Sequence, residues 1–145
     1  MKDYMHSFTI DIIGLMKGAE ISKDKVSGKK RLQMLHTAES IMVKHITEPI
    51  SIQDIASQLN VSERTLLYAF KKRFDMGPKV FMKILRLNHV HHLLNQDNGK
   101  DSISAIARES GFWHMGQFHV DFKSFFGELP SETIRNSKEQ SKNTH

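Results

Sequence analysis

The sequence predicts an all-α protein, with a seven-helix domain of two helix-turn-helix subdomains joined by a long linker helix. Three observations predict this class. Apolar residues recur at helical spacing through residues 32–135, where strand patterns are scarce. Serines stand where several of these helices would begin. The segment after residue 101 repeats the segment after residue 50.

Residues 1–31 are expected to form a short N-terminal helix and a linker. Helical spacing of apolar residues favours an amphipathic helix over residues 1–17, whereas residues 18–30 are polar, Gly-rich and aperiodic. The region is interpreted as the remnant of a sensor or dimerisation domain, a dimer contact or an ordered arm, in a chain that is a fragment or lacks a sensor. The apolar positions are Tyr4, Phe8, Ile12 and Leu15.

Three helices are expected in the first half of the domain. The first spans about Leu32 to Ile46, and Pro49 closes the segment after it. Ser51 is placed to cap a short second helix, and Asp54 completes an acidic capping box. Ser62 is placed to cap the third helix. That helix follows a turn at Asn60 and Val61, and its core positions are Leu66, Phe70 and Phe74.

A long helix over residues 79–95 is expected after Gly77 and Pro78, because proline favours the first helical position. Its apolar residues fall on several faces, so it should be packed on more than one side. Residues 136–145 are polar and lack apolar positions, which predicts a disordered tail.

The residues after the long helix match those before it, position by position. The offset is 51 in the first helix of each pair and 52 in the second, so the second copy has one extra residue in its turn. Such agreement indicates a duplicated structural unit. The matched pairs are Ser51 and Ser102, Ile52 and Ile103, Ile55 and Ile106, Ala56 and Ala107, Leu66 and Phe118, Phe70 and Phe122, Lys71 and Lys123, Phe74 and Phe126, and Pro78 and Pro130.

Each copy has the three kinds of residue that a helix-turn-helix needs. A small residue stands where the helices cross, the turn holds a residue that tolerates left-handed backbone, and an apolar residue after it enters the core. The order occurs twice, which favours DNA binding over a helical hairpin repeat that serves protein contact. The residues are Ala56, Asn60 and Val61 in the first copy, and Ala107, Gly111 and Phe112 in the second.

The net charge of +5 is weak evidence for a nucleic-acid partner. Residues 36–135 hold 12 Lys and Arg against 11 Asp and Glu, so local placement must decide. The absence of cysteine excludes disulfides, thiolate zinc sites and cysteine nucleophiles. No apolar run approaches the ~20 residues that span a bilayer, and the N-terminus does not resemble a signal peptide. A cytoplasmic protein without a membrane partner is expected.

No arrangement for catalysis or metal binding is recognisable. A nucleophile, base and orienting residue do not occur together in a known pattern, so neither an enzyme nor a cofactor is expected. His89 and His92 are three residues apart on a helix, but a third ligand is not evident. Buried or surface histidines are therefore favoured over a metal site.

The chain resembles AraC/XylS-type transcription regulators over about residues 36–135. The resemblance implies seven helices, binding to double-stranded promoter DNA, usually activation through contact with RNA polymerase, and often a separate sensor or dimerisation domain. The related DNA-repair proteins transfer alkyl groups to cysteine, which this chain lacks. The most specific pieces are residues 51–56 and 62–74, Arg86–Leu87, and the run from Ile106 through Gly111–Phe112 to Phe118, Phe122–Lys123, Phe126–Gly127 and Pro130.

Base contacts are expected chiefly from the helix that begins after Ser62. Arg64 is placed to bind guanine through two hydrogen bonds, and Leu67 to pack on a thymine methyl group. Tyr68 is placed to touch a base edge or a phosphate. The alternative is an ordinary solvated face, which the duplicated motif disfavours. The expected phosphate contacts are Ser62, Thr65, Lys71 and Lys72.

The second helix of each helix-turn-helix copy is the recognition helix, which would enter the major groove. In the second copy this helix is expected to contact mainly phosphate, because the side chains of its outward Gly116 and Val120 cannot form hydrogen bonds. Met115 and His119 are its expected base contacts, with limited apolar contact from Val120. Trp113 is expected to be a packing residue. The expected phosphate contacts are His114, Gln117 and Lys123.

The long helix would span about 25 Å, enough to set the two units about one DNA turn, ~34 Å, apart. Arg86 is expected either to contact phosphate or to pair with an acid of the second unit. The main alternative function is a protein-interaction module that keeps the fold but has lost specific DNA binding. Two features favour this alternative: the second recognition helix offers few hydrogen-bonding side chains, and the net charge of residues 36–135 is close to zero.

Overall fold

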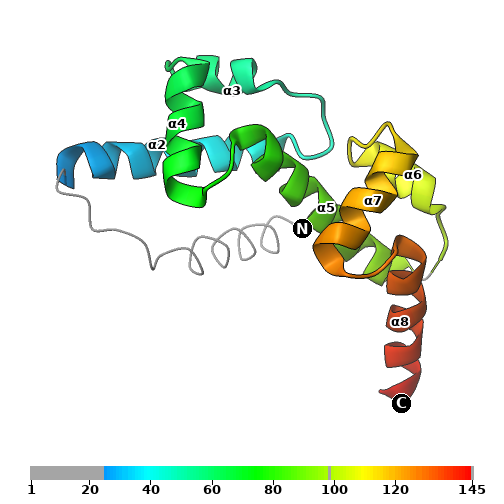
Figure 1. Cartoon of the computed structure of the whole chain (residues 1–145). Coiled ribbons are helices and arrows are strands. Elements are labelled where there is room, and N and C mark those ends of the chain that lie inside the picture. Colours follow the sequence, from blue (N-terminus) through cyan, green and yellow to red (C-terminus); the bar gives the residue numbers. More distant parts are fainter. Residues whose placement is uncertain (1–24, 98, 145) are drawn as a thin grey trace. The chain divides into compact units, whose positions relative to one another are not determined.

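Seven helices and no strand make up the described residues, 25–97 and 99–144, of this computed structural model. This confirms the predicted all-α class. The amphipathic helix expected over residues 1–17 lies outside the described residues. None of the seven helices is both long and apolar enough to cross a membrane. The helices are α2 (Lys25–Lys44), α3 (Ile52–Gln58), α4 (Glu63–Phe74), α5 (Pro78–Asp97), α6 (Ile103–Glu109), α7 (Met115–Phe126) and α8 (Pro130–Asn143) (Figure 1).

The described residues divide into two compact units. The first comprises residues 25–45 and 49–85, and the second comprises residues 46–48, 86–97 and 99–144. Because the boundary falls between Leu85 and Arg86, α5 contributes its first half to one core and its second half to the other. This explains why its apolar residues fall on several faces.

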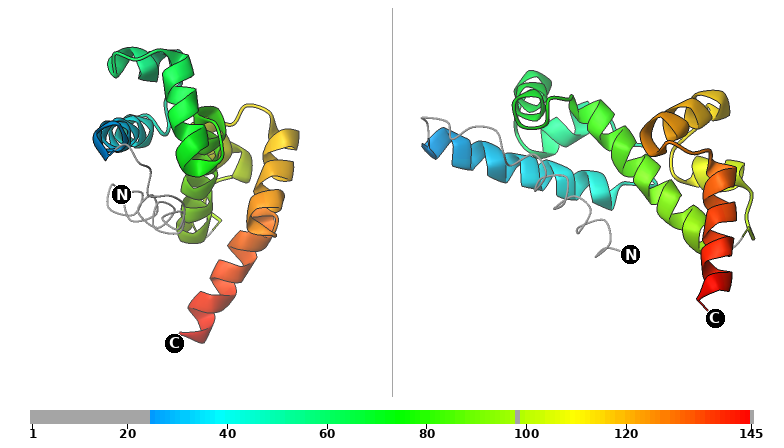
Figure 2. Two further views of the ribbon diagram at one scale, coloured as in Figure 1. Left: turned by 60° about the vertical axis from the view of Figure 1, so that its left-hand side comes forward. Right: turned by 60° about the horizontal axis from the view of Figure 1, so that its bottom comes forward.

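The first unit packs α2, α3 and α4 against one another and against the first turns of α5 (Figures 1 and 2). Three rings close its core: the centroids of Phe70, Phe74 and Phe81 lie 4.9–5.5 Å apart. Met42 of α2 and Ile55 of α3 are fully buried beside α4. The core stripe predicted for α4 is confirmed.

The second unit has a separate core, built by α5, α6 and α7. Burying apolar side chains from three helices is the main stabilising contribution in such a unit. Phe112, Met115, Phe126 and Ile134 pack against this core while remaining partly exposed. The fully buried set is Leu87, Val90, Leu94, Ile106, Ala107, Phe118 and Phe122.

Helix α2 is longer at its N-terminus than the sequence predicted. It begins at Lys25 rather than Leu32 and ends at Lys44, so part of the expected linker is helical. Lys and Arg are good helix formers, and the buried Leu35 and Met42 anchor the later turns. An extension without apolar periodicity leaves no signal for pattern recognition.

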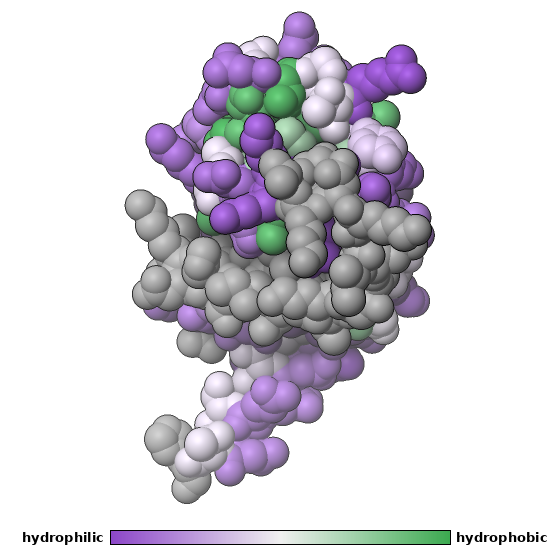
Figure 3. Space-filling view, turned by 90° about the vertical axis from the view of Figure 1, so that its left-hand side faces the viewer, coloured by the Kyte–Doolittle hydropathy of each residue, from purple (hydrophilic) through white to green (hydrophobic). Residues whose placement is uncertain are grey.

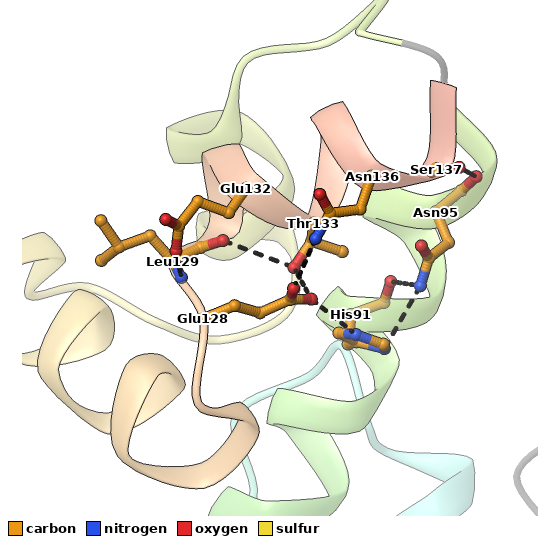
Figure 4. A network of polar contacts seen from close by, with 8 residues as sticks. All are labelled: His91, Asn95, Glu128, Leu129, Glu132, Thr133, Asn136 and Ser137. Carbon is orange, nitrogen blue, oxygen red and sulfur yellow. Dashed lines mark hydrogen bonds and ion pairs between the residues drawn. The ribbon is translucent and has the colours of Figure 1, made fainter. Parts of the chain in front are cut away.

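The prediction of a disordered tail was wrong for residues 136–143, because α8 continues through Asn143. Ser137 Oγ donates to Asn95 O of α5 at 2.7 Å, and Asn136 Nδ2 donates to Glu128 Oε2 at 2.9 Å (Figure 4). These polar contacts hold the helix where apolar ones are few.

Glu128 is the centre of this polar network. Its Oε1 accepts a hydrogen bond from Thr133 Oγ1 at 2.7 Å and lies 3.5 Å from His91 Nε2 (Figure 4). The hydrogen bond from Thr133 is the largest cause that lowers the pKa of Glu128. The His91 ring also stacks on Phe126, with centroids 4.3 Å apart. One carboxylate thus joins the start of α8 to α5.

Candidate nucleic-acid interface

A tight turn joins α3 to α4. Asn60 has a φ of 55°, and the Val61 N–H donates to Ala56 O at 3.0 Å. Ala56 is buried, so only a small side chain fits where the two helices cross. The predicted small and turn residues therefore have the expected places in the first copy, whereas Val61 is half-buried and lines an open cleft instead of entering the core.

The turn between α6 and α7 repeats this geometry. Gly111 has a φ of 90°, and the Phe112 N–H donates to Ala107 O at 2.9 Å, which is the equivalent bond in the second copy. A Cβ at Gly111 would lie 3.1 Å from the Arg86 guanidinium. The predicted duplication of the helix-turn-helix is confirmed at the level of single hydrogen bonds.

The two recognition helices end alike and begin differently. Asp75 and Gly127 both adopt left-handed backbone after the last turn, with φ values of 55° and 76°. Ser62 Oγ caps α4 by accepting from the Thr65 N–H at 3.1 Å, whereas the His114 side chain makes no capping bond to α7. Ser62 and Thr65 also join hydroxyl to hydroxyl at 2.9 Å, so both polar groups are held at the start of α4.

The outer face of α4 is basic and exposed, as predicted. Arg64, Lys71 and Lys72 are exposed on this helix, opposite the buried Leu66 and Phe70. Leu67, also exposed, adds an apolar group at the side of this face. The face therefore offers hydrogen-bond donors, positive charge and one apolar contact.

Tyr68 is 58% exposed and lies close to two cations. The Arg31 guanidinium carbon is 5.6 Å from its ring centroid, and Lys72 Nζ is 5.9 Å from it. A cation over an aromatic face is attracted by the ring quadrupole. Arg31 lies outside the predicted domain boundary at residue 32. The only sequence signal for it was the basic run at residues 29–31.

The outer face of α7 is small and uncharged at its centre. Val120 is 62% exposed, and a Cβ on Gly116 would meet no atom within 4 Å. Lys123 is exposed beyond them. Gln117 Nε2 donates to Asp121 Oδ1 at 2.9 Å, so this amide already has an acidic partner.

Two residues of α7 that were expected to contact bases, Met115 and His119, also make contacts within the second unit. Met115 packs against the core of the second unit. His119 Nδ1 lies 2.7 Å from Met115 O, and because a carbonyl can only accept, Nδ1 donates. The other ring nitrogen, Nε2, is the one available to a partner outside the chain.

In the structure, the Arg86 guanidinium donates to two backbone carbonyls of its own unit. Its Nε donates to Ile46 O at 3.1 Å and its Nη2 donates to Glu48 O at 2.7 Å. Burial lowers the pKa of the guanidinium. Two backbone carbonyls of the α2–α3 connection therefore bind the Nε and Nη2 groups of Arg86.

Trp113 is 73% exposed, so the prediction of a packing residue was wrong. It occupies the extra position of the second turn, after Phe112 has entered the core. Trp113 therefore lies at the surface, directly before His114, the N-cap residue of α7.

The histidines of α5 have separate environments. His89 is 2% exposed, and burial lowers its pKa. His91 belongs to the Glu128 network. Over residues 25–97 and 99–144, no three potential ligands gather as a metal site.

Within the part of the chain that the structure describes, two matched helix-turn-helix units on seven helices define a protein of the helix-turn-helix class. The helix-turn-helix domain family matches residues 55–136. The crystal structure of a probable AraC family transcriptional regulator from Rhodopseudomonas palustris is 30% identical, with a TM-score of 0.68 over 72% of this chain and 97% of that one. An AraC-type regulator from Chromobacterium violaceum is 31% identical, with a TM-score of 0.69 over 75% and 96%. The chain belongs to the AraC family of transcription regulators, which is not a class of enzymes.

Among curated relatives, the XylDLEGF operon transcriptional activator of Pseudomonas putida is 29% identical over 126 residues. The alignment covers 86% of this chain and 39% of that protein. A probable thc operon regulatory protein of Rhodococcus erythropolis is 29% identical over 103 residues, which are 31% of its length. This chain therefore spans well under half the length of these relatives.

Proposed function

We propose that this chain regulates transcription by binding promoter DNA in a sequence-specific way, with α4 and α7 in adjacent major grooves. The observation that carries the proposal is the repeated turn, in which Val61 and Phe112 donate the same hydrogen bond to Ala56 and Ala107. Such a turn sets a second helix at the angle that enters a major groove. The basic outer face of α4 supports contact with a polyanion.

In the first unit, Arg64 binds guanine, Leu67 packs on a thymine methyl group and Tyr68 touches a base edge or phosphate. Their exposure on one side of α4 supports these roles. Phosphate positions the unit and carries no direct sequence information. The phosphate contacts are Ser62, Thr65, Lys71 and Lys72.

In the second unit, phosphate contacts dominate. His114 and Lys123 are exposed and carry them, with a smaller part for Gln117 because Asp121 shares its amide. Base contact there is limited to His119 Nε2 and to apolar contact from Val120. Met115 contributes only the part of its side chain that is not packed against the core.

Activation of transcription is proposed by analogy with the Pseudomonas putida activator. Contact with RNA polymerase is proposed from the resemblance to AraC/XylS-type regulators. We further propose that the protein acts in the cytoplasm and that dimerisation, where it occurs, uses the region before α2. These points rest on the family and not on a contact within the described residues.

A mobility-shift titration with mixed-sequence duplex across a range of salt tests DNA binding. A DNA-binding protein loses affinity steeply as salt rises, whereas an interaction module without DNA affinity shows no shift at any salt. The uncharged centre of α7 and the exposed Trp113 are what favour that second candidate. Trp113 is the only tryptophan, so a change in its emission on adding duplex reports contact by the second unit.

Selection of sites from a randomised duplex pool tests the residue roles. Arg64→Ala should relax the preference at particular base pairs. The loss of discrimination should be ~1–3 kcal/mol for each base pair that Arg64 contacts. Lys71→Ala should weaken all sequences alike. Equal, sequence-independent losses from both variants would contradict the role given to Arg64.

A further inference from the structure

The N-terminal turns of α2 carry a concentration of positive charge that helix stability does not explain. The first turn contains no acidic residue and begins at Lys25, although the positive end of a helix favours acidic side chains. Lys29, Lys30 and Arg31 follow directly, and the first two of these are exposed. We therefore expect these positive side chains to interact with a partner outside the helix.

These turns border the recognition helix of the first unit across an open cleft of about 550 Å³. Lys30 and Arg31 of α2 form one wall, and Thr65 and Tyr68 of α4 form the other. Met34 contributes apolar atoms between them. Figure 3 views this side of the molecule: hydrophilic side chains border a small hydrophobic group near the top, at the height of α3 and α4 in Figure 1.

The cluster of Arg31, Tyr68 and Lys72 joins this cleft to the outer face of α4. With the guanidinium carbon 5.6 Å and Nζ 5.9 Å from the ring centroid, both cations stand beside a side chain that is itself proposed to touch DNA. Positive groups from two helices thus line one flank of the recognition helix. A helix in the major groove has a phosphate backbone along each flank, so the expected occupant is a row of phosphates.

We propose that Lys30 and Arg31 bind the DNA phosphate backbone beside α4, and that Arg31 also positions Tyr68 through its ring. The inference rests on the proposed DNA-binding function and enlarges the interface beyond the two helix-turn-helix motifs. The occupant is a duplex because its backbone presents several phosphates in line with the cleft and the outer face of α4. A neutral or cationic partner would not match these charges.

The test measures how the affinity of the full chain for a mixed-sequence duplex depends on salt. The double variant Lys30→Gln/Arg31→Gln should bind more weakly, and the slope of log K against log salt should fall by about 1.8 because two phosphate contacts are lost. Lys44→Gln/Lys142→Gln is the matched control. It removes two charges, one from the last turn of the same helix and one from α8, and should leave the slope unchanged.

Arg31→Lys separates charge from packing, because it keeps the charge and loses the planar guanidinium. It should keep the parent slope, and the single variant Lys30→Gln should lower the slope by about 0.9. A parent slope in the double variant, with DNA binding intact, would overturn this inference alone. A parent chain that binds no duplex at any salt would overturn the proposed function and this inference together.

Discussion

At the scale of single residues, Asn60 and Gly111 occupy equivalent positions in the two turns but are under different structural constraints. Both adopt positive φ in the helix-turn-helix turn, and the sequence predicted this from residue type. Only at Gly111 does a second constraint act, because a Cβ would lie 3.1 Å from the Arg86 guanidinium. That arginine comes from another helix, so its approach could not be inferred from the local pattern.

Gly111→Ala should therefore lower the free energy of unfolding by about 1–2 kcal/mol, through left-handed strain and contact with Arg86. Urea denaturation measures the change. Gly116→Ala is the matched control, since its Cβ would meet no atom within 4 Å. It lies in the first turn of α7 and should be neutral or stabilising by about 0.5 kcal/mol. Equal losses from both would show that the turn geometry is not the cause.

Arg86 is the residue whose role changed most between sequence and structure. Arg86→Lys should destabilise the fold by about 2 kcal/mol, because an ammonium group cannot reproduce both hydrogen bonds to Ile46 O and Glu48 O. Urea denaturation checks this cost. Arg86→Gln, which removes the charge, should leave the salt slope for DNA at the parent value, and a fall of about 0.9 would instead restore the phosphate role.

At the scale of helices, α3 and α6 are equivalent but are capped by different chemistry. Ser51 and Asp54 form the predicted reciprocal box: Ser51 Oγ accepts from the Asp54 N–H at 3.0 Å, and the carboxylate accepts from the Ser51 N–H at 3.0 Å. Ser102 accepts only from the Ala105 N–H, at 3.1 Å. One cap thus includes a titratable group and the other does not.

Ser51→Ala should cost about 1 kcal/mol at pH 7, and less in acid. The side-chain hydrogen bond from Ser51 is the largest cause that lowers the pKa of Asp54. A lowered folded-state pKa contributes stability above the ordinary carboxyl range, and this is lost as pH falls through the lowered value. Urea denaturation at pH 7 and near pH 3 measures the difference. Ser102→Ala should cost about the same at both pH values.

The helix boundaries show where sequence patterns lose information. Caps and buried stripes predicted α3 and α4 closely, because the capping serines Ser51 and Ser62 and the apolar residues at helical spacing are local features of the sequence. The start of α2 and the end of α8 were missed because basic or polar residues form their outer turns. In α8, Ser137 is held by Asn95 of α5, which is distant in sequence and so belongs to no local pattern.

At the scale of the whole molecule, two cores share one continuous helix. Phe70 and Phe122 occupy equivalent positions of α4 and α7, and each is fully buried in its own unit. The repeat at offsets of 51 and 52 predicted this duplication, because burial selects the same residue types in both copies. It could not predict which outward residues have partners, since those contacts follow no repeat.

Phe70→Ala and Phe122→Ala should each cost about 3–5 kcal/mol but in different places. Native-state hydrogen exchange should show Phe122→Ala exposing amides of α6 and α7 while α3 and α4 keep their protection, and the reverse for Phe70→Ala. Loss of protection throughout both units from either substitution would mean that the cores unfold together.

The sparse outer face of α7 has a consequence for the evolution of target sites. Where Arg64 and Tyr68 stand on α4, α7 presents Gly116 and Val120, which offer neither donor nor acceptor from their side chains. Mutations in the operator half beneath α7 should therefore be tolerated and accumulate. The half beneath α4 should stay nearly invariant, and a new promoter should come under control by acquiring that half alone.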